Sequence, residues 1–191
     1  MAPAAVVTLV PVKAFTQAKR RLSPTLGPAE RAALARTMAD GVLVAAAAAP
    51  VAVACDDAEV ATWAESRGAR VVWTAGLGLD GAVARGLEVL AGDGYRQVIV
   101  AHADLPLATD LTRVAHFPGV TIVPDRHEDG TNVLCVPCTP AFPFAYGPGS
   151  FRRHHAAARA LGHDVHIARL PDLSWDVDVP DDLIAVTPAP V

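Results

Sequence analysis

Short apolar runs alternate with longer, helix-forming segments along most of the chain, and this alternation restricts the possible folds more than any other feature of the sequence. The clearest runs are 6–10, 51–54 and 97–101. Continuous apolar runs of this kind are typical of strands buried on both faces. Strands joined by helices favour parallel βαβ units. The sequence therefore predicts an α/β fold, a three-layer αβα sandwich around a mostly parallel sheet.

The residues that start helices help to place the other elements. Pro28 suits the first position of a helix, Asp56 or Asp57 can cap the next one, and Ser150 can cap the last long one. We predict strands at 6–10, 51–54, 70–73, 97–101, 120–123, 132–136 and 165–170. We predict helices at 28–49, 57–67, 80–90, 109–116 and 150–161, and a short one after residue 182.

Length and composition narrow the class of protein. The chain has 191 residues, enough for one domain with a buried core, and we expect a single domain over 1–191. Its 52% hydrophobic content excludes a disordered chain, and its net charge of -4 argues against a nucleic-acid binder. No apolar stretch reaches the roughly 20 residues of a membrane span, and the N-terminus is typical of a strand rather than a signal peptide. We therefore expect a cytoplasmic protein without a membrane partner.

Cys135 and Cys138 form a C-x-x-C pair that could indicate a zinc or redox site. Zinc needs about four ligands, and no second pair or nearby histidine motif completes the set. A redox pair would stand at a helix start, whereas this pair lies in or just after the apolar run 132–136. We interpret both residues as buried thiols.

Ligands of open α/β sheets bind where the strands end, so an acidic residue just beyond a buried strand is a candidate for a functional site. Asp104 directly follows the run 97–101, and Leu105 and Pro106 turn the chain away. A carboxylate in this place can bind a hard cation through oxygen. The alternative, a helix cap, is less suitable because Thr109 stands nearer to the next predicted helix.

A second acidic group follows the last predicted strand. Asp176 and Asp178 are two residues apart in an extended segment, so their side chains point to the same face. Like charges side by side repel each other unless a cation compensates them. Asp181 and Asp182 differ, because they stand at a predicted helix start, where they complement the helix dipole.

Together, three of these carboxylates predict a magnesium site. Mg²⁺ prefers oxygen ligands and usually bridges substrate phosphates, whose charge it neutralises. We expect Asp104, Asp176 and Asp178 to be the metal-binding, catalytic residues, with Mg²⁺ as the cofactor.

Other segments could bind phosphates or a nucleoside. Four cations after the first strand can hold a triphosphate, although a solvated basic turn is the alternative. Thr131 and the Gly-Pro-Gly-Ser segment 147–150 offer hydroxyl and backbone N–H groups for an anion, although the latter can be a simple turn. The segment 76–82 could approach a base or ribose closely through its glycines. The residues concerned are Lys13, Lys19, Arg20 and Arg21 for the triphosphate, Thr131, Gly147 and Ser150 for the anion, and Gly78 and Asp80 for the nucleoside.

Read together, these segments resemble the guanylyltransferases of deazaflavin-coenzyme (coenzyme F-420) biosynthesis, which join GMP to 2-phospho-L-lactate or phosphoenolpyruvate and release pyrophosphate. The Asp-Gly-Thr-Asn segment at 129–132 and the Gly-Pro-Gly-Ser-Phe segment at 147–151 are its most specific part, whereas Asp-Leu-Pro at 104–106 occurs in many nucleotidyltransferases. The resemblance covers nearly the whole chain, in the segments 10–13, 18–23, 78–82, 102–106, 124–132, 146–154 and 176–183.

The resemblance implies a glycosyltransferase-A-like, Rossmann-related fold, with GTP and a small phosphorylated carboxylic acid as substrates. It also implies that Asp104, Asp176 and Asp178 bind Mg²⁺, that Thr131, Gly147 and Ser150 hold the acceptor's phosphate, and that Lys13, Lys19 and Arg20 bind the GTP phosphates. Two departures stand out: Asp80 occupies a place where relatives often carry Asn, and Trp175 replaces a commoner aliphatic residue.

Two alternatives remain open at this point. One is a related small nucleotidyltransferase that uses CTP or ATP, or another phosphorylated acceptor. The other is a non-catalytic nucleotide-binding domain, although such a domain has little need of three converging carboxylates. Phosphoenolpyruvate ranks first among the acceptors, because the Ala, Arg, Pro and Gly bias is typical of GC-rich, actinobacterial genomes, where the resemblance implies this acceptor.

Overall fold

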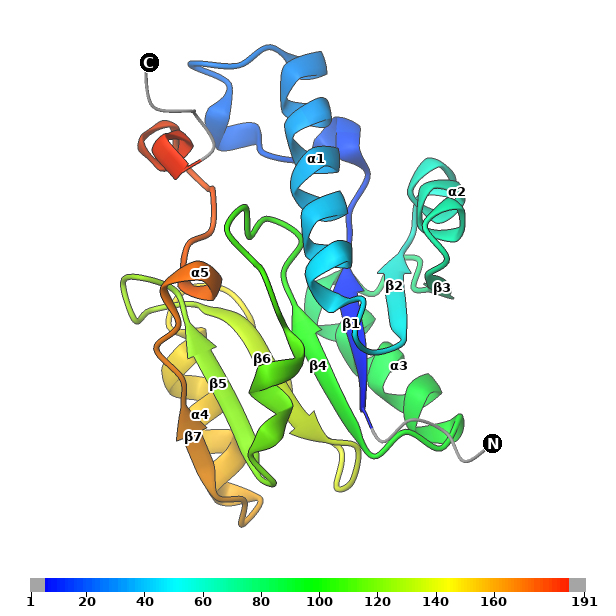
Figure 1. Cartoon of the computed structure of the whole chain (residues 1–191), viewed down its shortest axis with the longest axis vertical. Coiled ribbons are helices and arrows are strands. Elements are labelled where there is room, and N and C mark those ends of the chain that lie inside the picture. The colour runs from blue at the N-terminus through cyan, green and yellow to red at the C-terminus, as the bar shows by residue number, and fades with distance from the viewer. Residues whose placement is uncertain (1–5, 186–191) are drawn as a thin grey trace.

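The computed structural model describes residues 6–185, and all seven of the strands described belong to one sheet with helices on both faces (Figure 1). The strands are β1 (Val6–Pro11), β2 (Val51–Cys55), β3 (Arg70–Trp73), β4 (Gln97–Ala101), β5 (Val120–Pro124), β6 (Thr131–Pro137) and β7 (Val165–Ile167). The α-helices are α1 (Pro28–Ala46), α2 (Ala58–Ser66), α3 (Gly78–Gly92), α4 (Ser150–Ala160) and α5 (Pro171–Ser174). Short 3-10 helices are η1 (Phe15–Gln17), η2 (Arg20–Leu22), η3 (Thr112–His116) and η4 (Pro180–Ala185).

The strand order explains where a site can form. The sheet runs β3-β2-β1-β4-β6-β5-β7, and among the described strands only β6 is antiparallel to its neighbours. Ala101, the last residue of β4, pairs with Val133 near the start of β6. The beginning of β6 therefore lies at the same edge of the sheet as the ends of β1, β2 and β4. The predicted α/β sandwich with a mostly parallel sheet is confirmed.

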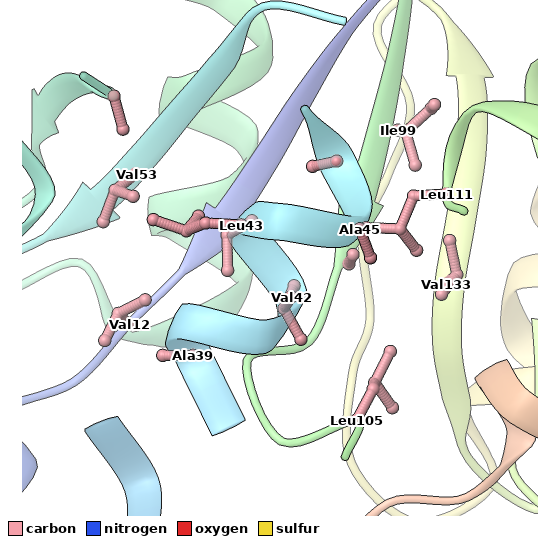
Figure 2. Packing of buried hydrophobic residues seen from close by; sticks show 14 of the residues in the cluster. Val12, Ala39, Val42, Leu43, Ala45, Val53, Ile99, Leu105, Leu111 and Val133 are labelled. Atoms are coloured by element: carbon pink, nitrogen blue, oxygen red, sulfur yellow. The ribbon is translucent and has the colours of Figure 1, made fainter. Parts of the chain in front are cut away.

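Each face of the sheet carries its own apolar core. On one face, α1 and α2 pack against the strands together with the turn after β4. Figure 2 shows Val42 and Ala45 of α1 pointing toward this turn and toward β4 and β6. On the other face, α3 and α4 cover a cluster that includes Leu9, Leu87 and Leu134. These two clusters produce the three layers.

The contact between α3 and β1 requires a glycine. A Cβ atom on Gly86 would lie 2.4 Å from Cδ2 of Leu9, whose side chain is fully buried. Gly41 in α1 has no heavy atom within 4 Å of the equivalent position. The same substitution should therefore have opposite effects at the two sites.

We expect Gly86→Ala to lower the free energy of unfolding by about 1–3 kcal/mol, because the added methyl group would overlap the buried Leu9 side chain and force it to shift. Gly41→Ala should raise it by about 0.5–1 kcal/mol, because alanine favours helix and meets no obstacle. Urea unfolding of the two variants beside the wild type measures both effects. Equal stabilisation by both alanines would contradict the close packing of α3 on β1.

The structure corrects three of the expected elements. Residues 109–116 form only the 3-10 helix η3, because the Asp110 carboxylate accepts hydrogen bonds from the backbone N–H and the hydroxyl of Thr112 and starts the helix there. The last strand ends at Ile167 rather than at 170, and Pro171 then opens the short helix α5. Ser150 is the first residue of α4 and does not cap it, because Gly149 occupies the cap position with a φ of 74°.

The C-x-x-C pair is buried, as expected of core thiols. Cys135 lies in β6, and burial raises the pKa of its thiol to about 12. Burial also raises the pKa of the Cys138 thiol. Both thiols therefore stay protonated at neutral pH and serve packing.

The described helices were also compared with the requirements of a membrane-spanning helix. None of the helices between residues 6 and 185 combines the length and the apolar character that a bilayer crossing requires.

Candidate active site

A cavity of about 710 Å³ opens at the edge of the sheet where the parallel strands end. Its walls come from the segments that follow β1, β2, β3 and β4, from the start of β6, and from the segments before α4 and after α5. Such an edge is the usual ligand site of an open α/β sheet. Two of the site residues predicted above, Arg20 and Asp80, do not line this cavity. The others do, and they are Lys13, Lys19, Arg21, Gly78, Asp104, Thr131, Gly147, Ser150, Asp176 and Asp178.

The carboxylates reach the cavity from two distant parts of the chain. Asp104 stands in the turn after β4, and the fully buried Leu105 anchors this turn in the core. The backbone N–H of Val177 donates to the carbonyl oxygen of Asp104 over 3.2 Å. This bond fixes the segment that carries Asp176 and Asp178 beside the turn after β4.

Lys19 lies between two of these carboxylates. Its Nζ donates to Oδ2 of Asp104 and, over 3.3 Å, to Oδ1 of Asp178. Only 10% of the Lys19 side chain is exposed. Burial opposes its charge, but the Asp104 and Asp178 carboxylates outweigh burial and raise the pKa of the ammonium above its usual value. Lys19 is therefore a fixed positive charge inside the site.

The pKa values of two of these carboxyl groups are shifted in opposite directions. Burial would raise the pKa of Asp104, but Lys19 and His102 lower it below its usual range. Asp176 behaves in the opposite way, because burial and the neighbouring charges of Asp104 and Asp178 raise its pKa. The cluster thus holds more negative charge than Lys19 compensates, which makes it a suitable place for a further cation.

The donor chemistry of this cluster fits Mg²⁺, although the side chains are arranged around an ammonium. Between residues 6 and 185, no group of three His, Cys, Asp or Glu side chains stands ready as a metal cage. Oδ1 of Asp104 is buried and finds no hydrogen-bond partner in the same part of the chain. A buried carboxylate oxygen without a partner is uncommon in proteins, and an oxygen of this kind can accept a hard cation.

Asp182 is more than the helix-dipole residue that the sequence indicates. Its carboxylate accepts the backbone N–H groups of Asp178 and Val179 over 2.6 and 2.8 Å, and it forms an ion pair with Arg126. Burial would raise the pKa of Asp182, but these N–H groups and Arg126 lower it. With only 2% of its surface exposed, Asp182 holds the backbone of Asp178 in place.

Two residues that we did not predict support the same loop. Arg126 lies over the Trp175 ring, 4.6 Å from its centroid, and its Nη1 donates to the carbonyl of Asp176 over 3.2 Å. Asn132 donates from Nδ2 to the carbonyl of Leu173 over 3.1 Å and to Oδ1 of Asp176 over 3.4 Å. Arg126 follows β5 and Asn132 lies in β6, and nothing in a single sequence shows that either side chain reaches the loop that carries Asp176.

Another part of the cavity wall has groups that are suited to an anion. Thr131 begins β6, and Ser150 begins α4 at the positive end of the helix dipole. Gly147 and Gly149, with φ angles of 93° and 74°, give the intervening turn a left-handed backbone that glycine adopts without strain. The Arg153 guanidinium donates hydrogen bonds to the carbonyl oxygens of residues 145–148, and these bonds hold the turn in its conformation.

For three of the residues predicted to bind the nucleotide, the structure shows a position relative to the cavity that the sequence does not specify. Arg21 lines the cavity and lies 3.4 Å from Oδ2 of Asp178, while the adjacent Arg20 lies outside the set of lining residues. Asp80 accepts the backbone N–H of Tyr146 over 2.7 Å and so connects α3 to the glycine-rich turn. Gly78, in contrast, lies on the cavity wall.

Comparisons with known proteins identify the family to which this chain belongs. The family described as "Guanylyl transferase CofC like" matches residues 6–187. A phosphoenolpyruvate guanylyltransferase of Sphaerobacter thermophilus is 36% identical, with 93% of this chain and 90% of that protein covered. A 2-phospho-L-lactate guanylyltransferase of Methanothermobacter thermautotrophicus is 33% identical, with 92% of this chain and 81% of that protein covered.

Solved structures show the same fold at lower identity. A putative nucleotide-diphospho-sugar transferase from Desulfovibrio desulfuricans superposes with a TM-score of 0.77 at 18% identity, covering 96% of this chain and 86% of that one. A CMP:2-keto-3-deoxy-manno-octonic acid synthetase complexed with CTP gives a TM-score of 0.60 at 15% identity, covering 96% and 97%. With a family match over nearly its whole length and relatives above 30% identity, this chain belongs to the guanylyl transferase CofC-like family.

Proposed function

We propose that this protein is a guanylyltransferase that joins GMP from GTP to phosphoenolpyruvate, or to the closely similar 2-phospho-L-lactate, and releases pyrophosphate in deazaflavin-coenzyme biosynthesis. The observation that carries the proposal is that one cavity is lined both by an acidic cluster and by an anion cradle. The acidic cluster consists of Asp104, Asp176 and Asp178, and the anion cradle consists of Thr131, Gly147 and Ser150. Relatives that match most of this chain carry the names of these two guanylyltransferases.

The proposed reaction needs no nucleophile from the protein. A phosphate oxygen of the acceptor attacks the α-phosphorus of GTP, a new P–O bond forms, and the bond to the bridging oxygen of the β-phosphate breaks. Pyrophosphate leaves with the electron pair of that bond. The acceptor phosphate is already deprotonated near neutral pH, so the protein accelerates the reaction by holding the two substrates in line and by compensating charge.

Different residues around the cavity have different parts in this reaction. Thr131, Gly147 and Ser150 hold the acceptor's phosphate, while Lys13, Lys19, Arg20 and Arg21 lie on or next to the side that takes the triphosphate. Asp104, Asp176 and Asp178 would hold Mg²⁺. When bound, this ion supplies charge neutralisation at the phosphates of GTP.

The anion cradle makes a separate prediction about the acceptor. We expect Ser150→Ala to raise the KM for phosphoenolpyruvate about tenfold, the effect of one lost hydrogen bond to a charged group, with little change in the KM for GTP. Steady-state rates with one substrate varied at a time measure both constants. Ser66→Ala is the matched control, because the Ser66 hydroxyl bonds to the Trp63 carbonyl within α2. An equal rise in both KM values would place Ser150 elsewhere in the reaction.

A substrate panel tests the proposed function. The purified protein is incubated with Mg²⁺, with GTP, CTP, ATP or UTP, and with phosphoenolpyruvate, 2-phospho-L-lactate or 3-phosphoglycerate, and pyrophosphate release is followed. We expect GTP with phosphoenolpyruvate to give the highest rate. A clear preference for CTP would contradict the guanylyl assignment, and nucleotide binding without turnover on any acceptor would favour a binding domain. Reaction with 2-phospho-L-lactate alone would correct the acceptor and leave the reaction class unchanged.

A further inference from the structure

A histidine stands directly behind the anion cradle and has no part in the reaction described above. His154 lies in α4 and is fully buried. Its Nδ1 is 3.0 Å from the hydroxyl oxygen of Thr131, and its Nε2 is 3.0 Å from the backbone nitrogen of Ala145. The ring therefore connects a residue on the cavity wall with the beginning of the glycine-rich turn.

These two contacts determine the tautomer of the ring. A backbone N–H can only donate, so Nε2 of His154 must be the unprotonated nitrogen that accepts from Ala145. A neutral imidazole carries its one proton on the other nitrogen, here Nδ1. Nδ1–H therefore donates to the Thr131 hydroxyl oxygen.

The surroundings keep the ring neutral and hold it in place. The Tyr146 ring contacts it edge-on at 4.8 Å between centroids, and Phe142 lies at 5.9 Å. Burial is the main reason why the pKa of His154 falls to about 4. The charge of Arg153 and the nearby His102 also lower this pKa, while Asp80 opposes them.

A fixed donor on one side of a hydroxyl fixes the direction of its proton. A threonine hydroxyl has a single proton, and its oxygen accepts from His154. The proton must then point away from His154. Thr131 is 2% exposed and lines the cavity, so the direction left for this proton is toward the cavity.

We propose that His154 is a positioning residue: through its Nδ1–H it orients the Thr131 hydroxyl as a hydrogen-bond donor to the phosphate of the acceptor. This inference rests on the proposed function, because it assumes that Thr131 faces the acceptor. His154 itself touches no substrate. It acts only through the hydroxyl of Thr131, and this restriction makes the inference testable.

The first test reads the tautomer without any ligand. In the ¹⁵N-labelled protein, long-range ¹⁵N–¹H spectra distinguish protonated from unprotonated ring nitrogens, and the His154 signals are identified by their absence in His154→Gln. The chain has seven histidines, so this subtraction is needed. We expect a protonated Nδ1 and an unprotonated Nε2 that do not change between pH 5.5 and 8. A protonated Nε2, or a ring that titrates near its usual pKa of about 6.5, would overturn the inference.

The second test uses two amides that each replace one nitrogen of the ring. The amide of asparagine can occupy the place of Nδ1, so His154→Asn can keep the donor to Thr131. The longer glutamine reaches the place of Nε2, so His154→Gln keeps the acceptor for Ala145 and loses the donor. We expect His154→Gln to raise the KM for phosphoenolpyruvate about tenfold with kcat and the KM for GTP little changed, and His154→Asn to restore most of this loss.

A double-mutant cycle with Thr131→Val separates positioning from a general structural role. If His154 acts through the hydroxyl, His154→Gln should raise the KM no further when Thr131 is already valine. The same rise in both backgrounds would show that His154 acts through the turn instead and would overturn the inference. His155→Gln, the same change at the next residue of α4, is the control, and thermal melting of each variant checks that the fold persists.

The outcomes distinguish this inference from the proposed function. A wild-type protein that forms no product with any acceptor would contradict the proposed function, while the tautomer experiment would still be decisive for the ring. In that case the wild type, the two single variants and the double variant are titrated with inorganic phosphate. Loss of phosphate affinity in His154→Gln that disappears in the Thr131→Val background would support the inference, and independent losses would contradict it.

Discussion

Asp104→Asn should lower kcat for pyrophosphate release by about 10³-fold, the largest effect that we expect from any single substitution. The change keeps the size of the side chain, removes its charge and replaces one carboxylate oxygen by an NH₂ group. Oδ1 of Asp104 is buried without a hydrogen-bond partner among residues 6–185, and Oδ2 binds Lys19. Both the proposed cation site and the Lys19 ammonium would therefore lose their common carboxylate. Initial rates at saturating GTP and phosphoenolpyruvate measure the loss.

The control for this variant is Asp164→Asn, which removes one charge from an exposed position before β7. Circular dichroism and thermal melting should show that both variants keep the fold, because Lys19 retains Asp178 as a partner. An Asp104→Asn variant with wild-type kcat would contradict the assignment of this residue to the metal site.

Asp182→Asn should lower the free energy of unfolding by about 1–3 kcal/mol and also reduce kcat by about tenfold or more. The carboxylate accepts three donors, the N–H groups of Asp178 and Val179 and the guanidinium of Arg126. An amide has one oxygen, and its NH₂ group would face one of these donors. The loop that carries Asp178 should therefore loosen, and the active site should lose its geometry.

The stabilisation of the fold by the Asp182 carboxylate should depend on pH. The pKa of Asp182 is lower in the folded protein than its ordinary value, so its stabilising effect is complete above the unfolded-state pKa of about 4 and disappears as the pH falls through the folded-state value. The difference in melting temperature between wild type and Asp182→Asn should thus be large at pH 7 and shrink on acidification below pH 4. Asp181→Asn, an exposed neighbour, should show no such difference. A gap that is constant over this pH range would contradict the role of the charge.

The sequence predicts the layers of this fold because its central strands are buried throughout, whereas its helices bury only one side. Runs such as 97–101 are apolar throughout, and the structure buries nearly every residue of β4. For the same reason, the apolar sequence of β6 does not show whether this strand is parallel or antiparallel to its neighbours. A strand buried on both faces reads equally well as parallel or antiparallel, so only the pairing of β4 with β6 reveals that Thr131 begins at the cavity edge. The span 109–116 fails as a helix prediction because a local bond from Asp110 competes with the helical pattern.

The sequence predicts that the carboxylates gather at one edge of the sheet, because the carboxyl ends of parallel strands lie at the same edge. The finer arrangement of the site was not predictable. In a 3-10 helix such as η2, neighbouring side chains point about a third of a turn apart, so a basic run does not say that Arg21 rather than Arg20 faces the cavity. Lys19 takes a left-handed conformation just before η2, with φ 53°, and no pattern in the sequence predicts that it bridges two carboxylates. The role of His154 was not predictable either. His154 is buried and His155 is only partly buried, and this difference becomes visible only in the structure.

The most direct test of the central claim is the identity of the product. GTP and phosphoenolpyruvate are incubated with the protein and Mg²⁺, and the mixture is followed by ³¹P NMR and mass spectrometry. We expect one pyrophosphate for each GTP consumed and a new phosphoanhydride signal in a product with the mass of GMP joined to phosphoenolpyruvate. Release of pyrophosphate with free GMP as the only other product, or a product formed from CTP in preference to GTP, would contradict the account.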